Sequence, residues 1–271
     1  MKKTKILNIL LSIICIFNIS CEEFFDTIEE KEELTQTEII SGLKKALEIG
    51  ADSAVSITSK EDGFYADKII KIFLPPEADI ILDKLDHPIL ANLGIDQKVE
   101  DVVLRLNRAA EKAASGATDI FINAITEMTI DEGLNILYGT NPLDSNADEN
   151  IFDSTAATGY LISTTYNNLV TLFSPIMDEA LDEPLVANIS TNQAWNILQD
   201  LYNEVATSPA NLLLGWQTVN IDLSDHATAK GLDGLFVKVK DEEKKIRENP
   251  LDWAINIIQK VFGYVKENPE G

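Results

Sequence analysis

The chain has 271 residues, 45 of them acidic and 22 basic, and its formal net charge at pH 7 is −23. A field of this sign repels phosphate backbones and anionic headgroups, so we expect neither nucleic-acid binding nor adhesion to a membrane through surface charge. The hydrophobic content of 45% excludes a wholly disordered chain and predicts a buried core.

The first twenty residues have the pattern of an export signal. Three lysines among the first five residues precede an apolar run over 6–19, which is shorter than the roughly 20 residues that span a bilayer as a helix. Ser20 then places a small residue before Cys21. This arrangement resembles the lipobox of bacterial lipoproteins, in which the cysteine is acylated and becomes the first residue of the mature chain. An ordinary signal peptide followed by a chance cysteine is the alternative.

Cysteine usage agrees with lipidation. Cys15 lies inside the segment to be removed, so Cys21 would be the one cysteine of the mature chain and no intramolecular disulfide can form. Residues 21–34 then form an acidic tether. We therefore expect residues 1–20 to be cleaved and acyl chains on Cys21 to attach the protein to a membrane. The expected location is the bacterial cell envelope, at the outer membrane, on its periplasmic or surface face.

Capping boxes and apolar spacings predict a succession of amphipathic helices. The boxes pair a hydroxyl residue with Glu or Gln three positions later, at Thr35 with Glu38, Thr129 with Glu132, and Ser190 with Gln193. The expected helices run over 35–59, from Asp96 to Ala113, through 120–125, over 129–137, through 162–177, over 190–205, over 224–248 and over 250–265.

Two short segments have strand character. "KIIKIFLPP" (68–76) is rich in β-branched residues, and "TVNIDL" (218–223) alternates apolar with polar residues. We predict that they pair as a minor ribbon that leans on the helices, because two strands alone are marginally stable. The expected fold is therefore all-α, an irregular multi-helix bundle with one minor two-stranded β ribbon. It forms a single domain over 35–267 with an inserted polar loop at 139–153.

Several stretches in combination resemble the bacterial domain-of-unknown-function family 4197, across about residues 37 to 263. They are "GLKKALEIG" (42–50), "GFYADKIIKIFLPP" (63–76), "NRAAEKAA" (107–114), "TAATGYL" (155–161), "LDGLFVKVKDEEKKIRENP" (232–250) and "KVFG" (260–263). The resemblance implies an exported, mainly helical protein of no established activity. It also implies that residues 141–153 are an insertion and that Gly159 stands where the family has an aspartate.

The motif near the C-terminus places charge on an apolar stripe. Glu242 and Glu243 lie three and four residues from both Val239 and Ile246, and a carboxylate that faces a core is costly unless it is paired. Arg247 is a partner for Glu243 at i,i+4. We hypothesise a polar cluster that joins these groups to the "NRAAE" helix, with the members Asn107, Arg108, Glu111, Glu242, Glu243 and Arg247. Either it is a structural salt-bridge network, or it is a ligand or acid–base site.

The inserted loop resembles a calcium-binding loop. Asp144, Asn146, Asp148 and Asn150 match ligand positions 1, 3, 5 and 7. The glycine at position 6 and the glutamate at position 12 are missing, so a solvated loop rich in Asx turns is the better interpretation. We expect no metal and no cofactor.

Three function classes follow. The favoured one is a lipid-anchored, non-catalytic helical interaction or structural module with an envelope protein partner or self-association. The second is a carrier or chaperone that binds an apolar ligand between its helices and contains a cavity on the order of several hundred Å³. The third is an enzyme that uses the Arg/Glu cluster, which requires those groups to converge in an open cleft.

Overall fold

The computed structural model describes residues 34–83, 99–148, 150–186, 189–209 and 215–267, and it confirms an all-α fold. The predicted signal segment and residues 21–33 of the tether lie outside the described residues, and Gln36–Gly271 forms one compact unit. The buried core runs from Ile39 to Phe262. A chain without residues 1–21 therefore keeps every residue of the described core.

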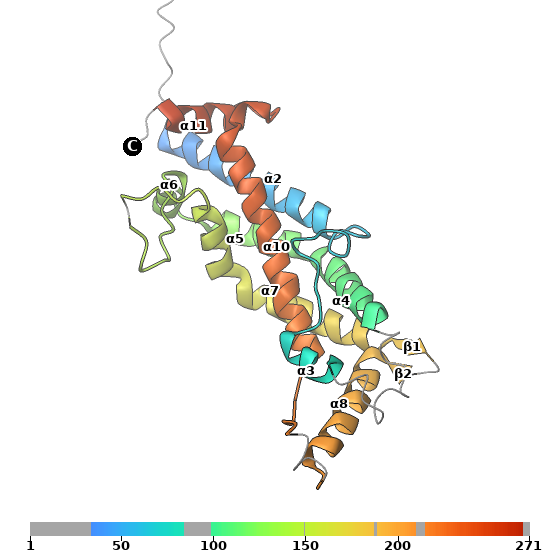
Figure 1. Ribbon diagram of the computed structural model, residues 1–271. Helices are drawn as coiled ribbons and strands as arrows, with labels where there is room; N and C mark the ends of the chain where they lie inside the picture. Colours follow the sequence, from blue (N-terminus) through green and yellow to red (C-terminus); the bar gives the residue numbers. More distant parts are fainter. Residues whose placement is uncertain (1–33, 84–98, 149, 187–188, 210–214, 268–271) are drawn as a thin grey trace, which may run out of the picture. The chain divides into compact units, whose positions relative to one another are not determined.

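Figure 1 shows the arrangement of the elements in the second unit. The longer helices are α2 (Gln36–Thr58), α4 (Val99–Ala114), α5 (Ala117–Glu127), α7 (Ala156–Asp182), α8 (Thr191–Thr207), α10 (Leu223–Glu248) and α11 (Asn256–Glu267). Shorter elements are the helices α3 (Asp79–Leu82) and α6 (Ile130–Leu137), the 3-10 turns η1 (Pro76–Ala78) and η4 (Pro250–Asp252), and the strands β1 (Pro184–Val186) and β2 (Ile189–Ser190).

Helix α10 is the centre of the bundle, where it packs against α7, α2 and α4 (Figure 1). The apolar stripe that the sequence predicts for it is buried, namely Leu232, Leu235, Phe236, Val239 and Ile246. Gly234 of α10 permits the segment that follows α2 to pack closely against this helix, because a β-carbon there would lie 2.5 Å from Cε1 of Phe64.

Helix α2 contacts two partners through glycines. At Gly42 a β-carbon would lie 2.6 Å from Cγ2 of Val261, so the close packing of α11 against the N-terminal part of α2 requires glycine at this position. At Gly50 the neighbours are Ile246 and Glu242 of α10, at ordinary contact distance. Helix α10 therefore lies in van der Waals contact with α2 at Gly50.

Two of the predicted capping boxes are present. At the start of α6 the Thr129 hydroxyl accepts from the N–H of Glu132 while Glu132 accepts from the N–H of Thr129. At the start of α8, Ser190 and Gln193 form the same reciprocal pair. Each box satisfies two helix-terminal donors without help from elsewhere, so a local pattern is enough to locate the helix start.

We expect Glu132→Gln to lower the melting temperature at pH 7 and to lose this effect as the solution is acidified. The N–H of Thr129 donates to Glu132 and holds the pKa of this carboxyl below its usual value. Because the folded-state pKa is the lower one, the carboxylate stabilises the fold above the ordinary glutamate pKa of about 4.3, and this stabilisation is lost as pH falls through the folded-state pKa. Thermal melts between pH 7 and pH 3 test it. A difference in melting temperature between the two proteins that stays constant down to pH 3 would contradict this prediction.

The predicted pairing of 68–76 with 218–223 is wrong. Residues 71–75 and 215–222 have no regular secondary structure, and neither segment joins a sheet. The ribbon that the described part of the chain does contain is the antiparallel pair β1 and β2, elsewhere in the sequence. Residues 68–70 form a turn, and helix side chains satisfy backbone groups of both segments.

Side-chain amides take the place of a neighbouring strand. Asn107 of α4 accepts from the N–H of Ile72 and donates to its carbonyl, both at 2.8 Å. In the second segment, Val219 exchanges the same two hydrogen bonds with Asn203, and Ile221 exchanges them with Gln199. Asn203 and Gln199 are one helical turn apart on α8, which matches the two-residue repeat of an extended chain.

Three other sequence expectations need correction. The buried face of α8 contains Trp195 and Tyr202, whereas Ile197, which helical spacing over the predicted range 190–205 would place on an apolar stripe, is 48% exposed. Helix α7 extends beyond the predicted range 162–177 at both ends, from Ala156 to Asp182, and Tyr166 is 38% exposed. The last helix begins at Asn256, because the residues after Pro250 form a 3-10 turn.

Candidate functional site

The predicted polar cluster is distributed over separate places. Arg108 contacts Glu111 at 2.6 Å and Asp62 at 2.7 Å. Glu111 also accepts from the N–H groups of Phe64 and Tyr65. None of the ion pairs among the described residues joins Arg108 to either glutamate of α10. The Arg108 group therefore attaches the turn after α2 to helix α4, while Asn107 holds Ile72.

The two glutamates of α10 also have different roles. Glu242 is buried, and its partner is Lys245, whose side chain is 60% exposed. Asp241 lies 3.9 Å from Lys238. Glu243 pairs with Arg247 as the sequence predicts, and both side chains are almost fully buried, at 5% and 7% exposure.

Glu243 caps the start of α7. It accepts from the N–H of Ala157 at 3.1 Å, and from the N–H and hydroxyl of Thr158 at 2.8 and 2.7 Å. Thr155, in the N-cap position, makes no side-chain capping bond. A carboxylate from α10 therefore satisfies donors that α7 leaves open, and its charge complements the positive end of the α7 dipole.

Arg247 binds carbonyl acceptors at the C-terminus of α6. Its guanidinium donates to the carbonyls of Ile136 and Leu137 at 2.8 and 3.0 Å, and to Glu243 at 2.9 Å. We call Glu243 and Arg247 the helix-end latch. This latch joins the N-terminus of α7 and the C-terminus of α6 to one turn of α10, and every group in it has a defined hydrogen-bond partner.

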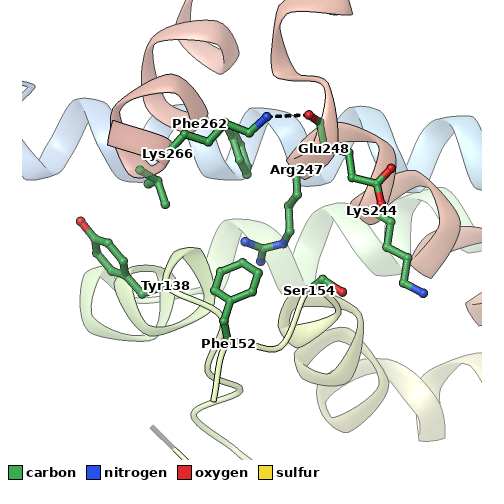
Figure 2. Close-up of a pocket in the computed structure, with 9 residues that line it drawn as sticks. Tyr138, Phe152, Ser154, Lys244, Arg247, Glu248, Phe262 and Lys266 are labelled. Atoms are coloured by element: carbon green, nitrogen blue, oxygen red, sulfur yellow. Dashed lines mark hydrogen bonds between the residues drawn. The ribbon is translucent and has the colours of Figure 1, made fainter. Parts of the chain in front are cut away.

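A cavity of about 510 Å³ lies beside the helix-end latch. Tyr138 and Phe152 face Lys266 and Phe262 across it, with the guanidinium of Arg247 on one wall (Figure 2). Among the described residues the lining comes from the end of α6, the inserted loop, α10 and α11, and consists of Tyr138, Phe152, Ser154, Lys244, Arg247, Glu248, Phe262, Val265 and Lys266. Of these, Arg247 alone was among the predicted site residues.

The inserted loop supplies one wall of this cavity. The ring of Phe152 lies 5.5 Å from the guanidinium carbon of Arg247, within the range of a cation–π contact. Gly159 of α7 leaves room for the loop, since a β-carbon there would lie 2.9 Å from the side-chain nitrogen of Asn141. No sequence pattern predicts that Phe152 lines a cavity, because an isolated aromatic residue in a polar loop has no periodicity that would indicate its neighbours.

The calcium-loop candidates form local turns. Asp144 accepts from the N–H of Asn146, and Asp148 accepts from both the N–H and the side chain of Asn150. These are Asx turns, the interpretation that the sequence favours for this loop. Nowhere in the described ranges do three or more His, Cys, Asp or Glu side chains gather closely enough to share a metal ion.

Among the described helices, none combines the length and the apolar character that crossing a bilayer requires. No curated protein and no solved structure matches the chain in the comparisons. A family model described as "Protein of unknown function (DUF4197)" matches residues 33–263, which is most of the chain and includes the helix-end latch and seven of the nine cavity-lining residues.

 Val265 and Lys266 lie just beyond the matched range. The chain therefore belongs to the DUF4197 family.

Proposed function

We propose that this protein is a lipid-anchored component of the bacterial cell envelope whose helical domain acts as a non-catalytic interaction or structural module. Export and anchoring are supported by the basic and apolar segment before Cys21 and by the acidic tether after it. The folded unit begins at Gln36, so the tether separates the acylated residue from the bundle.

One observation carries the non-catalytic part of the proposal. The buried carboxylates Glu111 and Glu243 each accept hydrogen bonds from two backbone N–H groups, and each has an arginine partner. An acid or base for catalysis needs an oxygen that a substrate can reach. Oxygens committed to the backbone of another segment serve the fold instead.

A second candidate function is a carrier for an apolar ligand. The cavity of about 510 Å³ beside the helix-end latch favours it, because small-molecule sites are mostly apolar concavities of roughly 300–1,000 Å³. The two functions are compatible, since a module that binds an envelope partner can also hold a lipid.

We expect Cys21→Ser to release the protein from the membrane fraction. Acyl chains are the proposed attachment, and the net charge of −23 gives the protein no electrostatic affinity for anionic headgroups. The test is fractionation of bacteria that express either form, with immunodetection of the chain in membrane and soluble fractions.

The matched control is Cys15→Ser, which changes a cysteine inside the segment proposed to be removed and should leave the distribution as in the natural protein. Retention of the Cys21→Ser protein in the membrane fraction after a high-salt wash would count against acyl anchoring.

A further inference from the structure

We propose that the cavity between α10, α11 and the inserted loop binds a single-chain amphiphile with one anionic headgroup. This inference rests on the carrier function proposed above and assigns a ligand class to its cavity.

The walls are suited to an aliphatic chain. Tyr138, Phe152 and Phe262 present aromatic surface from both sides of the cavity (Figure 2), and Val265 adds aliphatic surface to its lining. Phe152 is 57% exposed, an unusual position for a phenyl ring that borders a cavity. A ligand chain laid against this ring would remove apolar surface from water on both partners, which favours binding.

The charge at the cavity is opposite to that of the whole protein. Three lining residues are basic, Lys244, Arg247 and Lys266, and one is acidic, Glu248, although the chain carries a formal net charge of −23. The charge of Arg247 is offset by Glu243. The two lysines therefore set the local sign, and they favour a ligand with a negative end.

Both lysines have donors to offer. The ammonium of Lys266 donates to the carbonyl of Glu248 at 2.6 Å, which uses one of its three N–H groups. Neither Lys244 nor Lys266 takes part in any ion pair among the residues that the structure describes. A carboxylate or phosphate at the mouth of the cavity would find unpaired cations there.

The cavity lies at the end of the domain from which the tether starts. Helix α11, which forms one wall, packs against the N-terminal part of α2 at Gly42. The extended chain from Cys21 to Gln36 reaches at most roughly 50 Å. If Cys21 is anchored, which is the part of the argument that rests on the proposed function, single-chain lipids of the membrane are within reach.

Competition with a fluorescent fatty acid tests this inference on residues 22–271. The probe is 11-(dansylamino)undecanoate, displaced by dodecanoate, dodecyl phosphate or the neutral dodecanol. We expect both anions to displace the probe and dodecanol to do so at least several-fold more weakly. The stronger of the two anions identifies whether the headgroup is a carboxylate or a phosphate.

Two variants locate the site. The double change Lys244→Met and Lys266→Met should weaken dodecanoate by between roughly threefold and thirtyfold, given the strength of exposed charge pairs, and leave dodecanol unchanged. Val265→Trp should fill the cavity and reduce binding of all ligands. Lys230→Met is the matched control, because Lys230 lies on α10, as Lys244 does, but outside the cavity. Thermal melts verify that each variant is folded.

Three results would overturn the inference: no displacement of the probe by any ligand, equal displacement by dodecanoate and dodecanol, or binding that both cavity variants leave intact. Each of these would leave the anchoring proposal standing, because fractionation of the Cys21→Ser protein tests that proposal independently.

Discussion

Arg247→Met is expected to lower the free energy of unfolding by about 3–5 kcal/mol, because it removes one partner of a buried ion pair. Glu243 would remain in the core at 5% side-chain exposure without its counter-charge, and the carbonyls of Ile136 and Leu137 would each lose a charged donor. Methionine keeps most of the apolar volume of the arginine stem, so the loss reports the charge and its hydrogen bonds.

Urea denaturation followed by circular dichroism measures this change. Lys45→Met is the matched control, since Lys45 pairs with Glu48 on the surface of α2, with its side chain 50% exposed. We expect it to cost less than about 1 kcal/mol. Equal effects of the two substitutions would show that the helix-end latch does not stabilise the fold.

Asn107→Leu is expected to destabilise the protein by about 2–5 kcal/mol, the cost of leaving two buried backbone groups without partners. Asn107 is fully buried, and its amide pairs with both the N–H and the carbonyl of Ile72. Leucine has the same number and branching of side-chain heavy atoms as asparagine, so the shape is largely kept while the hydrogen bonds are lost.

The internal comparison is Asn203→Leu, which removes the same pair of bonds from Val219 at a partly buried position. Water can replace the lost partners there, so we expect a smaller loss. Chemical denaturation of both variants tests the ranking. An Asn107→Leu protein as stable as the natural one would refute the view that this amide takes the place of a strand.

Features set by local sequence were predictable. The capping boxes at Thr129 and Ser190 involve residues three apart, and the stripe on α10 repeats at helical spacing. The Glu243–Arg247 pair follows from the i,i+4 rule. In each case the partner lies within one turn of the same helix, so spacing alone identifies it.

Features set by tertiary contacts were not predictable. An extended segment needs partners for its backbone, and the sequence does not show that Asn107 supplies them to Ile72 in place of a second strand. The buried face of α8 shifts toward Trp195 and Gln199 because their side chains donate to the carbonyl of Ile221. That preference depends on a segment more than twenty residues away.

In the candidate site, too, features set by local sequence were predictable and features set by tertiary contacts were not. Burial of Glu242 and Glu243 was evident from the stripe, and both are buried. The identity of their neighbours was not evident, because it depends on which helix ends α10 crosses. Phe152 and Lys266 meet at the cavity only because the inserted loop and α11 fold against the same turn of α10.

The most direct test of the proposed anchoring is the mass of the N-terminal peptide from the full chain, expressed in a bacterium and extracted from its membranes. We expect residues 1–20 to be absent and Cys21 to carry the mass of attached acyl chains. A peptide that begins elsewhere, or that begins at Cys21 with a free thiol, would contradict the account.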